Sequence, residues 1–236
     1  MRLDGRAYDE IRPVRIKPGF VEYPEGSVLI EMGRTRVLCN ASIEESVPRW
    51  RQGSGSGWVT AEYAMLPRST HQRTRRETRW PSGRSQEIRR LIGRSLRTAV
   101  DLDRLGERTI ILDCDVLQAD GGTRTASVSG SYVALALAVR DLEDRGIVDP
   151  NVLTTEVAAI SLGLVEGELL LDLCYEEDSA ATADFNIVMT GDGRLIEVQG
   201  TAEGEPFGRE AMDAVLDLAH RGISQMLGLQ QQVLRR

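Results

Sequence analysis

The chain has 236 residues, of which 41% are hydrophobic and 28% charged, a composition typical of a globular protein rather than a disordered or fibrous one. Its longest apolar runs, such as residues 133–139, are too short to cross a bilayer, and its polar N-terminus lacks the apolar core of a signal peptide, so we expect a cytoplasmic protein. The net charge of −7 argues by itself against a nucleic-acid-binding protein.

The first sixty residues have the short apolar runs and turn residues of β-structure. The expected strands cover residues 14–17, 20–23, 27–32 and 35–42, separated by Pro-Gly, Pro-Glu-Gly and Met-Gly turns. A flexible loop follows at residues 52–57, and residues 58–65 return to an extended pattern.

Residues 68–97 form a strongly basic block within the acidic chain. They contain ten arginines and only two acids, and so carry a charge of +8. A local block of this kind is the electrostatic footprint of a site for a polyanion. Its first part, residues 68–79, has few apolar residues and is expected to form an exposed arm. From Ser85, the expected N-cap, apolar residues recur at helical spacing, which would place Arg84 just before a helix.

The rest of the chain repeats this sequence of strands and helices. We expect a strand at 109–117, a helix at 127–142, hairpins at 157–175 and 184–199, and a last helix at 207–229. Strands followed by helices therefore occur twice, over roughly residues 10–142 and 155–229. This order predicts an α+β fold, a single domain over residues 1–236 with two pseudo-repeated halves, mixed or antiparallel sheets and helices packed between them.

The segment Asp120-Gly121-Gly122-Thr123-Arg124 has the composition of a phosphate site. It lies between an expected strand and an expected helix. Glycines allow a close approach of the backbone to an anion, and a helix N-terminus presents free N–H groups. Thr123 and Arg124 add a hydroxyl and a guanidinium. A plain turn with a capping threonine would have the same composition.

A second candidate is the acidic segment 176–184. Asp172, Asp178 and Asp184 recur at even spacing along a path that we expect to be largely extended. Acids grouped at strand ends can be metal ligands, a general acid or surface turn charges, and spacing alone leaves these alternatives open. Asp113 and Asp115 alternate onto one face of a strand, and we assign them no catalytic role. The loop 200–207 is treated as structural.

Cysteine and histidine exclude some chemistries. The three cysteines are widely spaced in apolar segments, so we expect buried thiols rather than disulfides or a zinc site. Only two histidines are present, which disfavours a mechanism with a histidine base or a histidine metal cage.

Six segments together resemble the bacterial ribonuclease PH family, and the resemblance runs nearly from end to end. They are residues 6–14 (RAYDEIRPV), 37–48 (VLCNASIEESVP), 57–71 (GWVTAEYAMLPRSTH), 86–102 (QEIRRLIGRSLRTAVDL), 112–127 (LDCDVLQADGGTRTAS) and 174–206 (CYEEDSAATADFNIVMTGDGRLIEVQGTAEGEP). The segment 112–127 and the run IEVQGTAEGEPF are long and specific.

The resemblance implies a phosphorolytic 3′→5′ exoribonuclease. Such enzymes use inorganic phosphate as co-substrate to attack the last phosphodiester at an RNA 3′ end, reversibly release nucleoside 5′-diphosphates, and trim transfer-RNA precursors. It also implies a fold built from a duplicated β-α unit, and a homohexamer assembled as a trimer of dimers.

The resemblance also assigns roles to individual residues. Its phosphate site corresponds to Arg84, Gly122, Thr123 and Arg124. Its catalytic carboxylates, which would also bind Mg²⁺ or Mn²⁺, correspond to Asp178 and Asp184. Its RNA-binding arginines correspond to Arg68, Arg73 and Arg76. Two small departures, a shorter arm between Arg79 and Gly83 and an alanine at position 183, leave these residues in place.

Three other functions are compatible with parts of this sequence. A catalytically silent ring subunit would be expected to lose the arginines or aspartates, and all are present. A hydrolytic nuclease needs an activated water rather than an anion pocket and releases monophosphates. A purely structural RNA-binding protein would leave the paired acids without a use.

Overall fold

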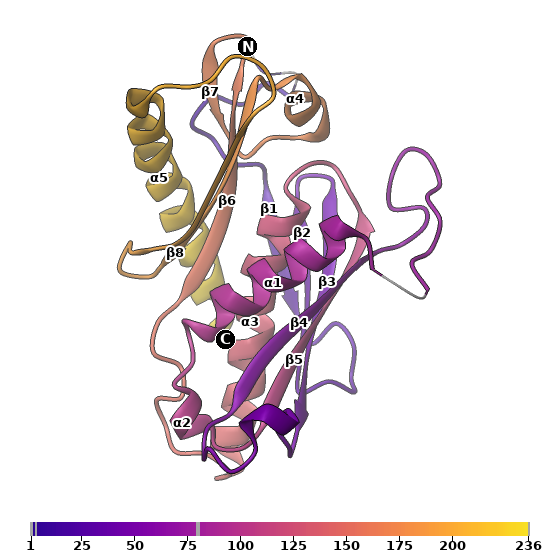
Figure 1. Ribbon diagram of the computed structural model, residues 1–236, viewed down its shortest axis with the longest axis vertical. Coiled ribbons are helices and arrows are strands. Elements are labelled where there is room, and N and C mark those ends of the chain that lie inside the picture. The colour runs from indigo at the N-terminus through magenta and orange to yellow at the C-terminus, as the bar shows by residue number, and fades with distance from the viewer. Residues whose placement is uncertain (1, 3, 79–80, 236) are drawn as a thin grey trace.

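The computed structural model describes residues 2, 4–78 and 81–235, which form two β-sheets with helices packed between and beside them (Figure 1). The predicted α+β class is therefore confirmed. All three cysteines are free and buried, as expected. In the part of the chain that the structure describes, every helix is too short or too polar to cross a membrane.

The first sheet has five strands in the order β1-β2-β3-β5-β4. Their bounds are β1 (Val14–Pro18), β2 (Gly26–Met32), β3 (Thr35–Glu44), β4 (Trp58–Met65) and β5 (Thr109–Gln118). Only β4 and β5 pair in parallel, and α1 (Gly83–Arg97) connects them as a crossover helix. A short 3₁₀ helix (Arg49–Arg51) and α2 (Leu102–Leu105) complete the connections of this half.

The second sheet has four antiparallel strands in the order β7-β6-β8-β9. Their bounds are β6 (Val157–Val165), β7 (Glu168–Leu171), β8 (Ala183–Thr190) and β9 (Leu195–Ala202). The short helix α4 (Tyr175–Ala180) lies between β7 and β8, and α5 (Arg209–Leu234) packs on β6 and β8. The two sheets thus fall within the two predicted halves, while the pseudo-repeat itself stays a prediction.

Helix α3 (Thr123–Asp144) holds the two sheets together. It contacts β2 and β3 of the first sheet and β6 of the second. Small residues line most of it, and its side chains from Thr125 to Ala136 are all buried. Because this helix begins directly after the glycine pair at 121–122, its N-terminus is fixed at the boundary between the halves.

Two sequence predictions of local structure are wrong. Residues 20–23 form bends rather than a strand, because Phe20 and Tyr23 are exposed and have no apolar surface to pack against. Asp178 does not lie on an extended path but in α4. Acidic residues occupy the first turn of that helix, where they complement the free N–H groups, and the Glu177 carboxylate accepts a hydrogen bond from the Cys174 N–H at 3.0 Å.

The starts of the two long helices of the first half also differ from the prediction. Ser82, not Ser85, caps α1, because its hydroxyl accepts a hydrogen bond from the Ser85 N–H at 3.2 Å. Arg84 therefore lies inside the first turn of α1 rather than before it. Helix α3 starts at Thr123, four residues earlier than predicted, so Thr123 and Arg124 belong to its first turn.

Candidate active site

A cavity of about 430 Å³ opens at the boundary between the two halves. It is lined by residues from the N-terminal turns of α1 and α3, from helix α4 and from one face of the second sheet. Its lining residues are Arg84, Gly122, Thr123, Arg124, Ser161, Asp178, Ser179, Ala181, Asp184, Phe185, Asn186 and Glu203. Of the nine residues to which the resemblance assigns a role, six thus line one cavity.

The glycine turn before α3 is shaped for the close approach of an anion. Gly121 and Gly122 have φ values of +75° and +63°, which side chains rarely tolerate. A Cβ at Gly121 would lie 2.4 Å from the Leu173 carbonyl oxygen, so no larger residue fits there. Helix α3 has no side-chain cap at its N-terminus. Its first N–H groups are therefore available to a bound anion, and the helix dipole favours negative charge.

Two arginines add positive charge to this cavity. Arg84 lies in the first turn of α1. The Arg124 guanidinium is held from one side, because it donates to the Gln199 side-chain oxygen at 2.6 Å and pairs with Glu87 at 3.3 Å. Gln199 in turn donates to Glu87 at 2.8 Å. Sequence reasoning missed Glu87 and Gln199, which lie 112 residues apart and meet only in the folded protein.

Asp178 and Asp184 reach the cavity from α4 and β8. Burial raises the pKa of Asp178, and the like charge of Asp184 raises it further, while Arg84 and Arg124 act in the opposite direction. The cavity therefore combines the positive charges of Arg84 and Arg124 with a pair of carboxylates that repel each other. A bound cation would relieve that repulsion.

Four further polar residues of the cavity, Ser161, Ser179, Asn186 and Glu203, were given no role from the sequence. Ser161 and Asn186 are directly opposite each other on β6 and β8, and Asp184 lies two residues before Asn186 on the same face. Strand alternation around Asp184 is the signal that could have found Asn186. Glu203 follows β9 in the loop that we treated as structural, so that interpretation overlooked a cavity residue.

Arg68, Arg73 and Arg76 do not line the cavity. They are exposed on the segment between β4 and α1, which projects away from the body of the protein (Figure 1). The Arg68 side chain folds back towards its own loop, and its guanidinium donates a hydrogen bond to the backbone carbonyl of Thr70 at 3.1 Å. Any role of these arginines must therefore concern parts of a ligand that extend beyond the cavity.

Asp113 lies outside the cavity and has a consequence for stability. Its pKa is raised, first by partial burial and then by Asp115 and Glu62, the latter being directly opposite on β4. The folded state thus binds the Asp113 proton more tightly than the unfolded chain does. Stability is lost as the pH rises from the unfolded pKa of about 3.9 through the raised folded pKa.

We expect Asp113→Asn to be more stable than the unchanged protein at pH 7, with a melting temperature higher by about 1–2 °C. The gain should shrink as the pH is lowered towards about 4, where the carboxyl group of the unchanged protein is increasingly protonated in both states. Thermal unfolding across this pH range checks the prediction, with Glu44→Gln on the exposed end of β3 as control. A pH-independent gain would show that the charge of Asp113 is not its cause.

Fold and cavity together define an α+β protein in which two arginines and an uncapped helix N-terminus lie beside paired carboxylates, the combination expected of a phosphate-transfer enzyme. Residues 10–141 match the model of the 3′ exoribonuclease family, domain 1, and residues 155–222 match that of domain 2. The chain belongs to the 3′ exoribonuclease family.

Curated relatives cover nearly the whole chain and carry the name ribonuclease PH. The protein of Bacillus pumilus is 55% identical over 236 residues, which are 99% of this chain and 98% of the relative. That of Dehalococcoides mccartyi strain BAV1 is 54% identical over 231 residues, covering 97% and 96%. The resemblance seen in the sequence is thus confirmed.

Solved structures share the fold at low sequence identity. Rice (Oryza sativa) Rrp46 superposes with a TM-score of 0.81 at 17% identity, over 99% of this chain and all of that one. A chain of the Archaeoglobus fulgidus exosome with RNA bound to the active site gives a TM-score of 0.79 at 23% identity, over 96% and 91%.

Proposed function

We propose that the protein is a phosphorolytic 3′→5′ exoribonuclease that trims the 3′ ends of transfer-RNA precursors. An oxygen of inorganic phosphate attacks the phosphorus of the last phosphodiester, and the bond from that phosphorus to the 3′-oxygen of the preceding nucleotide breaks. The terminal nucleotide leaves as a 5′-diphosphate. The proposal rests on one observation. The uncapped glycine turn, the two arginines Arg84 and Arg124, and the paired carboxylates of Asp178 and Asp184 all line the same cavity.

The arginines of the cavity and the N-terminal N–H groups of α3 would hold the attacking phosphate. Arg84, Gly122, Thr123 and Arg124 all line the cavity. Holding phosphate there in line with the scissile bond converts a bimolecular encounter into a positioned one. The Glu87 and Gln199 contacts restrict the Arg124 guanidinium, which lowers the entropy lost when it binds phosphate.

Asp178 and Asp184 would assist the departure of the 3′-oxygen when its bond to phosphorus breaks. Because the pKa of Asp178 is raised, this side chain is suited to deliver a proton as general acid. Asp178 and Asp184 would also be the protein ligands of a divalent cation, Mg²⁺ or Mn²⁺. Among residues 2, 4–78 and 81–235, no cluster of three or more His, Cys, Asp or Glu side chains could hold a metal.

Two carboxylates still fit magnesium, which commonly binds through one or two of them and completes its shell with water and substrate phosphate. When bound, the ion would neutralise charge that develops on the transferred phosphate.

The direct test is phosphate dependence. A transfer-RNA transcript with a short 3′ extension should be shortened when magnesium and phosphate are both present, and should stay intact without phosphate. Because the reaction is reversible, nucleoside diphosphates in excess should lengthen the shortened RNA. Shortening without phosphate would indicate a hydrolase, and no shortening under any condition would favour a silent ring subunit.

The arm would bind the RNA backbone outside the cavity. We expect the double variant Arg73→Ala/Arg76→Ala to weaken RNA binding and to reduce the slope of log K against log salt by about 2, since each arginine lost removes one phosphate contact. The KM for phosphate should be unchanged. Binding titrations over a range of salt concentrations measure both affinity and slope.

The matched control for the arm is Arg145→Ala/Arg194→Ala, which removes two exposed arginines elsewhere on the protein. An equal loss of RNA affinity in both double variants would show that only the overall charge matters, and would contradict a specific role of the arm.

The assembly belongs to the same proposal. A homohexamer arranged as a trimer of dimers would place several arms around a common RNA path. The low-identity match to a chain of an archaeal exosome core shows the shared fold and leaves the assembly of this chain as a proposal.

A further inference from the structure

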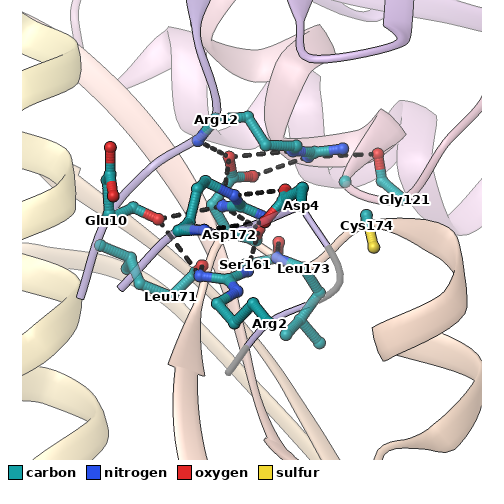
Figure 2. A network of polar contacts seen from close by, with 12 residues as sticks. Arg2, Asp4, Glu10, Arg12, Gly121, Ser161, Leu171, Asp172, Leu173 and Cys174 are labelled. Carbon is teal, nitrogen blue, oxygen red and sulfur yellow. Dashed lines mark hydrogen bonds and ion pairs between the residues drawn. The ribbon is translucent and has the colours of Figure 1, made fainter. Parts of the chain in front are cut away.

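A buried ion pair joins the N-terminal segment to the second half of the protein (Figure 2). The side chains of Arg12 and Asp172 are 3% and 0% exposed, and they are held by two side-chain contacts, at 2.7 and 3.0 Å. The backbone N–H of Arg12 also donates to the Asp172 carboxylate, at 2.8 Å. The two residues are 160 positions apart in the sequence.

The same guanidinium holds the glycine turn of the cavity. Arg12 donates to the Asp120 carbonyl oxygen at 2.5 Å and to that of Gly121 at 3.5 Å. A Cβ at Gly122 would lie 2.9 Å from an Arg12 nitrogen, so the turn rests directly on this side chain. Arg12 itself does not line the cavity. It acts from behind the backbone whose N–H groups face the proposed phosphate.

Asp172 in turn sets the entry to α4, the helix of Asp178. It follows β7 directly and has a φ of +53°, in the left-handed region. Its N–H donates to the Ser161 carbonyl at 2.7 Å, and the Leu173 N–H donates to the Ser161 hydroxyl at 3.3 Å. Figure 2 shows Arg12 between Asp172 and Gly121. One guanidinium therefore contacts both the phosphate-binding turn and the residue that leads into the catalytic helix.

Stability alone is a weak reason for such a pair, because the desolvation of two buried charges offsets much of their attraction. The shape of the guanidinium group gives a better reason for an arginine at this position. The planar guanidinium presents five donors in a fixed arrangement, and Arg12 uses it to connect Asp172 with two carbonyls of the turn. The ammonium group of lysine retains the charge but lacks this fixed geometry.

We propose that Arg12 and Asp172 are a positioning pair, which fixes the separation between the phosphate-binding turn and the Asp178 helix. This inference rests on the proposed function. It explains how two groups from different halves of the chain are kept at the spacing that an in-line attack requires.

The test is Arg12→Lys, which keeps the buried charge and loses the planar geometry. We expect the KM for phosphate to rise about tenfold and kcat to fall about tenfold, because displacement of the turn misaligns the attacking phosphate. The KM for RNA should stay within about twofold, since the arm is untouched. A second variant, Asp172→Asn, keeps side-chain volume, and asparagine tolerates the positive φ. Asp172→Asn should likewise raise the KM for phosphate and leave the KM for RNA nearly unchanged.

Gln230→Met is the control for general destabilisation. Gln230 is fully buried, donates to the Ser129 and Val157 carbonyls, and does not line the cavity. Its loss should lower the melting temperature and leave the KM for phosphate unchanged. If Arg12→Lys or Asp172→Asn is folded and has wild-type kcat and KM for phosphate, the positioning role is wrong while phosphorolysis stands. If the unchanged protein shows no phosphate-dependent release, the proposed function itself fails.

Discussion

Asp184→Asn is expected to abolish turnover and to leave RNA binding intact. The substitution keeps the size of the side chain and removes one of the three carboxylates that line the cavity, leaving Asp178 and Glu203. In the proposed mechanism, metal binding and proton delivery at the leaving 3′-oxygen would both depend on that charge, so we expect kcat to fall by about 10³-fold. In the proposed mechanism RNA affinity would depend on the arm, so it should change by less than about twofold. Single-turnover assays and binding titrations measure the two effects separately.

The control for this prediction is Asp192→Asn, which removes an exposed carboxylate from the turn between β8 and β9. It should retain the full rate. A near-normal rate for Asp184→Asn would remove Asp184 from the catalytic machinery, and an equal loss in both variants would point to damage to the second sheet.

Arg124→Ala has the second-largest expected effect, and it should act on phosphate rather than on RNA. The lost guanidinium would have made charge-assisted hydrogen bonds to the attacking anion. Each such contact contributes about 1.5–3 kcal/mol, so the KM for phosphate should rise about 10–100-fold. The KM for RNA should change far less. Initial rates measured against each substrate in turn give both constants.

Arg145→Ala is the matched control, because Arg145 follows the same helix at its far end and pairs only with Asp141 among the described residues. It should leave both constants unchanged. If Arg124→Ala raised the two KM values equally, Arg124 would belong to the RNA path rather than to the phosphate site.

Periodicity predicted most of the elements of this fold. The last helix and the strands of the second sheet were found because their apolar residues recur regularly, although the predicted strand 168–175 ends at Leu171 and the predicted helix 207–229 continues to Leu234. The failures have local causes. Phe20 and Tyr23 are exposed, and α4 forms because acidic residues and the Glu177 contact stabilise its first turn.

The cavity shows where sequence reasoning ends. A glycine turn followed by threonine and arginine in the first turn of a helix predicts an anion site, because all of these groups are neighbours in the sequence. The contacts of Arg124 with Gln199 and of Arg12 with Asp172 join residues 75 and 160 positions apart, and no local pattern encodes them. Such contacts come from the packing of the two halves, which is why the supporting residues appear only in the structure.

The most direct test of phosphorolysis is the fate of the attacking phosphate. The protein would be incubated with magnesium, radiolabelled inorganic phosphate and an unlabelled RNA with a 3′ extension, and the released nucleotides would be separated. The proposed mechanism predicts nucleoside 5′-diphosphates that carry the label in the β-phosphate. Release of unlabelled nucleoside monophosphates would contradict it and would identify water as the attacking group.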